Sequence, residues 1–241
     1  MPHPKAAAAA PKIVYPDGRL FTTGIEQRSD LYWIDRDQGR PDPGGGGTPQ
    51  EVLGVSGCCA LFRVAAWRAV GGQDEAFHMY YEDVELALRL RAAGWRALYV
   101  PSAVCEHIGH GSIVKATTWK DELGERNRLL VLARHFPDRF ADELVRSPWF
   151  QSATPDQVRE MLPKLAARAG RSADSAMLDM VLALRDAVRE LAGEMDTKWG
   201  EHRNLPKILD ERERWIATLL DEVARLRIWR MPGKRLKPDE K

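Results

Sequence analysis

The residues best suited to chemistry lie in the sequence "YYEDVELAL", which begins at Tyr80 and opens a helical pattern. Two adjacent carboxylates, Glu82 and Asp83, follow two tyrosines, and Glu85 comes two residues later. Carboxylates at a helix start are stabilised by free N–H groups and the helix dipole, by roughly 0.3–1 kcal/mol each, with no function required. The aromatic run "FHMYY" before them is instead typical of a cleft wall. The segment therefore leaves a solvated helix start, a metal site and a catalytic base open.

Two histidines follow an apolar run in the sequence "CEHIGHGS", namely His107 and His110. Loops after strands often carry functional residues, and neutral imidazole is a ligand for Mn, Zn and Fe. Two histidines make only part of a ligand set. A carboxylate from the Glu82–Asp83 region would complete the case for a metal site.

Two other short sequences have a chemical and a structural interpretation. The tripeptide "DRD" at 35–37 has the spacing that can chelate Mg²⁺ or Mn²⁺ on a diphosphate, but its turn-rich surroundings predict a solvated loop. Gly57, in "SGCCALFR", can let the backbone approach a ligand closely, or can simply permit a tight turn between a strand and a helix.

The elements that must position these groups alternate between strand and helix up to about residue 140, which predicts an α/β fold. Few strong strands are visible, and their number is small for a complete sheet covered on both faces. The expected strands are 11–15, its return strand 19–25 after the "PDG" turn, a segment from 51, and 95–101. The expected helices start at Val64 and span 82–94 and 124–136.

The remainder, 146–241, is predicted to be a separate helical region, with 1–145 as the α/β part. Helices are expected at 155–169, where Thr154 and Gln157 form a capping box, and at 174–194 and 206–229. The last two carry apolar seams, which suit a helical hairpin, a short coiled coil that joins an oligomer, or packing on the main part. The basic segment 225–241 suits either an anionic membrane surface or a solvated tail.

Bulk composition excludes several function classes. Lys+Arg (36) and Asp+Glu (35) nearly cancel, so charge gives no argument for nucleic acid. The three cysteines contain no CxxC pair, which argues against a disulfide framework or zinc–thiolate site and favours a reducing cytoplasm. Neither a secretory signal nor an apolar run long enough to span a bilayer is visible.

Taken in order, four segments resemble the bacterial family 2 glycosyltransferases, and within them the rhamnosyltransferase-like group that acts on cell-surface polysaccharides. The resemblance covers roughly residues 3–137. The four segments are "PKIVYPDGRLFTTG", "EVLGVSGCCALFR", "VGGQDEAFHMYYEDVELALRLRAAGWRALYVPSAVCEHIGHGS" and "GERNRLLVLARHFP".

This resemblance implies a partial GT-A (Rossmann-like) sheet and inverting transfer of a sugar from a nucleotide-sugar to a glycan acceptor in cell wall biogenesis. It places the catalytic base on Asp83, with Glu82 tuning or positioning it. The other implied site residues are Gly57, Tyr81 and Trp95 on the substrate side, and His107 and His110 for Mg²⁺ or Mn²⁺. The implied location is cytoplasmic, with peripheral contact to the inner face of the plasma membrane through the basic tail.

One departure from the family gives a rival interpretation. The match begins at a segment that follows the family's nucleotide-binding half, so that half is expected to be absent. The alternative is a non-catalytic remnant that acts as an interaction or scaffold protein through its C-terminal helices. The run "AAAAAPKI" favours helix by propensity, whereas the resemblance implies a strand, which we expect.

Overall fold

The computed structural model describes residues 3–108 and 117–168, together with isolated positions between 170 and 214. The chain divides into two compact units, residues 1–131 and 132–241. The first is a mixed α/β unit, which confirms the predicted fold class, and the described part of the second is helical. In the predicted helix 174–194 the described positions 178–179, 181–183, 185–186 and 189–190 are helical, whereas 206–229 is described only at position 214 and the basic tail 225–241 lies outside the described residues.

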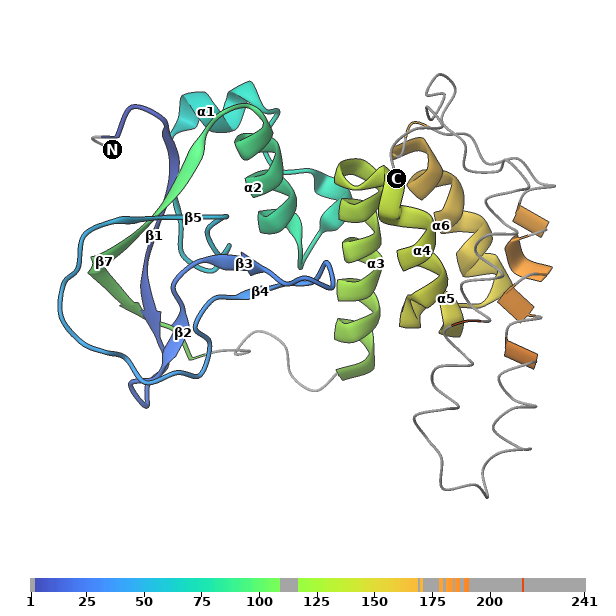
Figure 1. The fold of residues 1–241 in the computed structure, drawn as a ribbon, viewed down its shortest axis with the longest axis horizontal. Helices are drawn as coiled ribbons and strands as arrows, with labels where there is room; N and C mark the ends of the chain where they lie inside the picture. Colours follow the sequence, from blue (N-terminus) through green and yellow to red (C-terminus); the bar gives the residue numbers. More distant parts are fainter. Residues whose placement is uncertain are drawn as a thin grey trace. The chain divides into compact units, whose positions relative to one another are not determined.

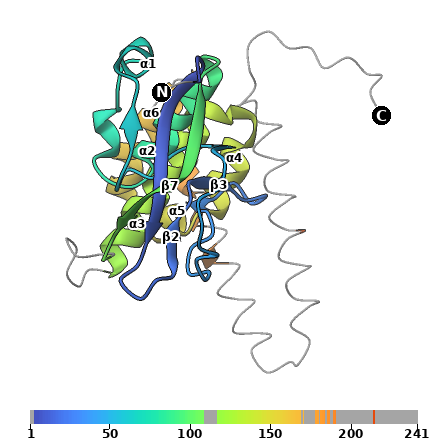
Figure 2. The same ribbon diagram turned by 90° about the vertical axis from the view of Figure 1, so that its left-hand side faces the viewer.

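The first unit is built on one mixed sheet with the strand order β2-β1-β7-β5, and β6 also pairs with β1 (Figure 1). β1 and β7 are parallel and lie side by side over most of their length (Figure 2). The other strands are antiparallel to their neighbours. The strands are β1 (Ala6–Val14), β2 (Leu20–Thr22), β5 (Gln50–Val52), β6 (Leu61–Phe62) and β7 (Arg96–Glu106).

The alanine run is part of β1, as the resemblance implied and against its helix propensity. Its small side chains are buried on both faces of the sheet. Ala8 and Ala10 belong to one core cluster with Val52 and Tyr99, while Ala7 packs with Leu86 and other residues of the two helices that follow. Burial against partners distant in sequence therefore overrides the local preference.

Two hairpins complete the β structure. β1 and β2 are joined at the predicted "PDG" turn, where Gly18 has a φ of +82° and its N–H donates to the Tyr15 carbonyl at 2.9 Å. β3 (Ile25–Gln27) and β4 (Trp33–Asp35) form a separate antiparallel pair that the sequence did not predict. Asp35, the last residue of β4, pairs with Ile25.

The helices of the first unit are α1 (Val64–Ala69), the 3-10 turn η1 (Glu75–Phe77), α2 (Glu82–Ala92) and most of α3 (Thr117–His135). α2 stops where expected, because Gly94 has a φ of +83° and donates to the Arg91 carbonyl at 3.0 Å. Its buried face includes Val84, Leu86 and Leu90. Arg91, near the end of the helix, is exposed instead.

The second unit contains α4 (Pro137–Arg146), α5 (Pro148–Ser152) and α6 (Pro155–Arg168). The capping box of α6 is confirmed: the N–H of Thr154 donates to Gln157 Oε1 at 2.7 Å, and the N–H of Gln157 donates to Thr154 Oγ1 at 3.3 Å. Within the part of the chain that the structure describes, no helix is both long and apolar enough to span a membrane.

Candidate active site

Asp83 is held between two backbone amides at the start of α2. Its Oδ2 accepts the N–H of Gly57 at 2.9 Å, and its Oδ1 accepts the N–H of Val84 at 2.8 Å. Gly57 lies in the loop between β5 and β6, so the first bond ties that loop to the helix start. Together the two bonds fix the orientation of the carboxylate.

The loop passes close to both acids at Gly57. A Cβ atom at this position would lie 3.3 Å from Glu82 Oε1 and 3.6 Å from Asp83 Oδ2. The backbone at Gly57 closely approaches the two acids of this chain, and its approach to a ligand stays a prediction.

The pair Glu82–Asp83 is not a solvated helix start. Burial raises the pKa of Asp83, and the N–H groups of Gly57 and Val84 only partly oppose this. Burial, and then the charge of Asp83, raise the pKa of Glu82. Glu82 Oε2 is buried and has no hydrogen-bond partner among the described residues. Glu85 differs, because Arg89 neutralises it with two bonds of 2.8 Å from Nε.

A further carboxylate joins this pair, namely Asp35. Burial is the main cause that raises the pKa of Asp35 to about 6, and the charge of Asp83 acts in the same direction. Hydrogen bonding from the Thr22 and Ser56 hydroxyls opposes the shift, as does His107. The prediction of a solvated loop at 35–37 was therefore wrong for Asp35, which lies half-buried at the end of β4.

Asp37, the other acid of the "DRD" tripeptide, binds neighbouring side chains. Its Oδ2 accepts the Thr23 hydroxyl at 2.6 Å, and its Oδ1 pairs with Arg40 at 3.1 Å. The two acids of the tripeptide thus have different partners.

His107 extends the sheet and lies near the carboxylates. Its N–H donates to the Val14 carbonyl at 2.8 Å, and its ring packs edge-on against Phe21 with centroids 4.6 Å apart. It lies close enough to Asp35 to influence its charge. His110, the second predicted metal ligand, lies outside the described residues.

The fit of a divalent cation can be tested on the donor groups present. In the described ranges, no three His, Cys, Asp or Glu side chains are arranged to hold a metal ion. Among the described residues, His107 and the nearby acids do not by themselves amount to a ligand set, so no step of the reaction below is assigned to a metal ion.

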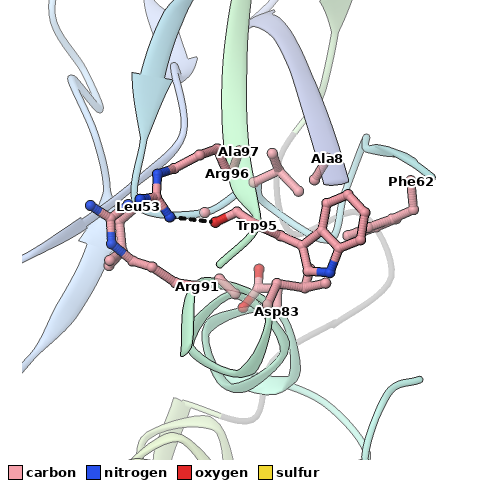
Figure 3. Close-up of a pocket in the computed structure, with 12 residues that line it drawn as sticks. Ala8, Leu53, Phe62, Asp83, Arg91, Trp95, Arg96 and Ala97 are labelled. Carbon is pink, nitrogen blue, oxygen red and sulfur yellow. Dashed lines mark hydrogen bonds between the residues drawn. The ribbon is translucent and has the colours of Figure 1, made fainter. Parts of the chain in front are cut away.

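Tyr81 and Trp95 line the surroundings of Asp83. Tyr81 packs edge-on against Trp33, with centroids 6.1 Å apart, and burial raises the pKa of its hydroxyl. Trp95 lines a cavity between α2 and the sheet, and Asp83 lines the same cavity (Figure 3). Trp95 thus lies near Asp83, and Tyr81 lies two residues before it in the chain, while their role on the substrate side stays a prediction.

The backbone that leads into the acid pair is strained. His78, Tyr80 and Tyr81 have φ values of 59°, 65° and 65°. His78 combines its φ with a ψ of −63°, and the N–H of Met79 reaches the Phe77 carbonyl at 2.6 Å, which is a strained γ-turn. Such residues cost on the order of 1–3 kcal/mol each and tend to occur at functional sites.

Known proteins resemble the segment that carries these residues. Residues 47–129 match the family model described as "Glycosyltransferase like family 2". An N-acetylglucosaminyl-diphospho-decaprenol L-rhamnosyltransferase of Mycobacterium tuberculosis is 35% identical over 126 residues, covering 45% of this chain and 40% of that protein. The corresponding protein of a second strain gives the same values. The chain thus spans less than half the length of these curated relatives.

The matched segment runs from the loop before β5 into α3, so it contains Gly57, the acid pair, Trp95 and His107. Over this segment the chain is similar to family 2 glycosyltransferases, and its mixed sheet agrees with the α/β fold class that the sequence predicted. The rhamnosyltransferase-like character inferred from the sequence is confirmed as a similarity.

Proposed function

We propose that this chain carries the acceptor-side part of an inverting family 2-type glycosyltransferase, with Asp83 as the catalytic base. The observation that supports this most is the setting of Asp83, a carboxylate held by two backbone amides at the edge of a cavity. The match of the surrounding segment to the family is independent support.

The proposed reaction is a single displacement at the anomeric carbon of a nucleotide-sugar. Asp83 takes the proton of the acceptor hydroxyl as its oxygen bonds to that carbon, and the donor's diphosphate leaves with the electrons of the broken C–O bond. A base works best with a pKa near the working pH. Burial shifts Asp83 in this direction, while the two N–H donors favour its ionised form.

Neighbouring residues have supporting roles in this proposal. Glu82 adds negative charge beside Asp83 and keeps the affinity of the pair for protons high. Tyr81 and Trp95 form apolar walls on the substrate side, and the Tyr81 hydroxyl, whose pKa burial raises further above neutrality, stays protonated. Gly57, which has no side chain, lets its loop approach the two acids closely.

The substrates are proposed from the relatives. Their printed name specifies L-rhamnosyl transfer to N-acetylglucosaminyl-diphospho-decaprenol. A nucleotide-activated deoxysugar and a lipid-linked glycan acceptor are therefore proposed here, within cell wall polysaccharide synthesis on the cytoplasmic face of the plasma membrane. Dependence on Mg²⁺ or Mn²⁺ and membrane contact through 225–241 are proposed on the resemblance and the basic sequence alone.

Calorimetry with dTDP- and UDP-sugars, followed by a transfer assay with the lipid-linked acceptor, tests the function. We expect binding near micromolar strength and a product whose anomeric configuration is opposite to that of the donor. Retained configuration would contradict the inverting mechanism. Absence of both binding and product would instead support the interaction-protein alternative.

A further inference from the structure

A buried asparagine of α3 contacts the turn that precedes the acid pair. Asn127 is fully buried, and its Nδ2 lies 2.8 Å from each of three backbone carbonyls, those of Phe77, Met79 and Tyr80. An amide nitrogen has two N–H donors, so the three oxygens share both. One side chain, distant in sequence, thereby binds three backbone carbonyls of the segment 77–80.

The orientation of this amide is itself determined. Arg126 Nη1 donates to Asn127 Oδ1 at 2.7 Å, so the oxygen faces a cation and the nitrogen faces the carbonyls. Arg126 Nη2 also donates to the Ala76 carbonyl at 3.2 Å. Adjacent residues of α3 thus hold the chain from Ala76 to Tyr80.

The segment that they hold needs such support. His78, Tyr80 and Tyr81 all have positive φ values without being glycine, and strained backbone persists only where its surroundings impose it. The segment ends at Tyr81, directly before Glu82 and Asp83, so its path sets the direction in which α2 begins.

We propose that Asn127 is a positioning residue of the candidate active site: it imposes the strained turn 77–81 and so aims Asp83 at the amide of Gly57. The inference rests on the proposed function for its catalytic meaning, but the positioning itself is a property of the unliganded chain. A side chain that merely fills the core would not affect Gly57, which belongs to a different loop.

Amide hydrogen exchange on the full chain tests the positioning. Asn127→Asp keeps the size of the side chain but removes both donors. We expect exchange at Gly57 and Val84, whose N–H groups bind Asp83, to become faster by about tenfold or more, while amides of β1 and β7 keep their protection. Glu122→Gln, a carboxyl–amide exchange on the exposed part of α3, is the matched control and should leave Gly57 and Val84 unchanged.

A rescue variant keeps the test decisive if Asn127→Asp does not fold. His78 is exposed and holds the strained γ-turn, and glycine adopts positive φ without that strain. Asn127→Ser retains one donor, and we expect His78→Gly to restore most of the protection that Asn127→Ser loses at Gly57 and Val84. Unchanged protection of these two amides in Asn127→Ser, or equal loss in β1 and β7, would overturn the proposal.

Kinetics separates this inference from the proposed function. If the chain transfers sugar, Asn127→Ser should lower kcat by about tenfold and leave the KM for the donor within about twofold, since a misdirected base weakens only the transition state. A wild-type chain without transfer would contradict the proposed function, while the exchange data would still decide the role of Asn127. A lowered affinity with unchanged kcat would contradict positioning of the base.

Discussion

The acids of the candidate site are buried, and among the described residues they form no salt bridge, which distinguishes them from the other acids around them. Asp35, Glu82 and Asp83 all have a raised pKa, chiefly because they are buried. Glu85 lies within the same helix and is fully buried, yet Arg89 neutralises it. Groups with perturbed pKa values that lie together are typical of functional sites, so these three acids are the ones to test.

Asp35→Asn should change how stability depends on pH. The folded-state pKa of Asp35 is raised from 3.8 to about 6. As the pH rises, Asp35 therefore keeps its proton to a higher pH in the folded state than in the unfolded chain. Stability is full below pH about 4 and falls as pH rises through 6, by roughly 2–3 kcal/mol. Urea unfolding between pH 4 and 7 should find the variant more stable than wild type at pH 7 by roughly 1–3 kcal/mol.

The advantage of Asp35→Asn should shrink as the pH falls toward 4, because Asp35 is then protonated in the folded wild-type chain and begins to be protonated in the unfolded chain as well. Glu82 and Asp83 contribute with the same sign, but they are present in both proteins and cancel. Unfolding curves that stay parallel at all pH values would contradict the assigned pKa of Asp35.

The sequence was sufficient to find some of these residues and not others. An acid pair after an aromatic run singles out Glu82 and Asp83, because local spacing alone places them at a helix start. Asp35 was missed, since its burial depends on the β3–β4 pair and on residues as distant as Ser56 and Asp83. The strand-like stretch "YWID" before it was the available signal.

The packing of α2 on the sheet depends on a glycine in the loop after β5. A Cβ atom at Gly54 would lie 2.6 Å from the Cβ of Ala87 in α2, and 3.2 Å from Ile25 Cδ1. The Gly54 carbonyl also accepts the N–H of Ile25 at 3.0 Å, which joins this loop to β3. Gly54 thus sets how closely the helix that carries Asp83 approaches the strands.

Gly54→Ala should therefore destabilise the protein. Neither the backbone of the loop nor the α2 Cβ can move without disturbing core contacts, and overpacking of this kind costs about 1–3 kcal/mol. Gly46→Ala is the matched control, because its nearest neighbour would be the Ser102 Cβ at 3.8 Å. Equal midpoints of thermal unfolding for the two variants would show that the close approach is not required.

Gly124→Ala should have the opposite effect. Gly124 lies inside α3, and a Cβ atom there would meet nothing within 4 Å. Because alanine is preferred over glycine in a helix interior, we expect a gain of about 0.5–1 kcal/mol in the free energy of unfolding. Chemical denaturation would measure it, and a loss of stability would mean that α3 is packed more tightly than its contacts indicate.

Helices were easier to predict than strands for a physical reason. The cap of α6 and the stop of α2 at Gly94 are local signals and are confirmed. β3 and β4 are three residues each and are stabilised by a partner strand rather than by their own pattern. The alanines of β1 show the same dependence, since only the buried neighbours on both faces make them a strand.

For the chain as a whole, the α/β part and the helical part follow from the change in composition along the sequence. Near-neutral charge gave no pointer to a ligand, so the function had to be argued from one short segment. That segment lies within the family match and brings together residues from β4, the β5–β6 loop, α2 and β7. The assignments of 1–145 and 146–241 to separate roles remain predictions.

Asp83→Asn tests the account most directly. The amide keeps the size of the side chain but cannot accept the acceptor's proton, so transfer from a nucleotide-sugar should fall by about 10²–10⁴-fold. Asp138→Asn, the same change at an exposed position of α4, should transfer sugar as the wild-type chain does. Transfer by Asp83→Asn at the wild-type rate would contradict the assignment of Asp83 as the base.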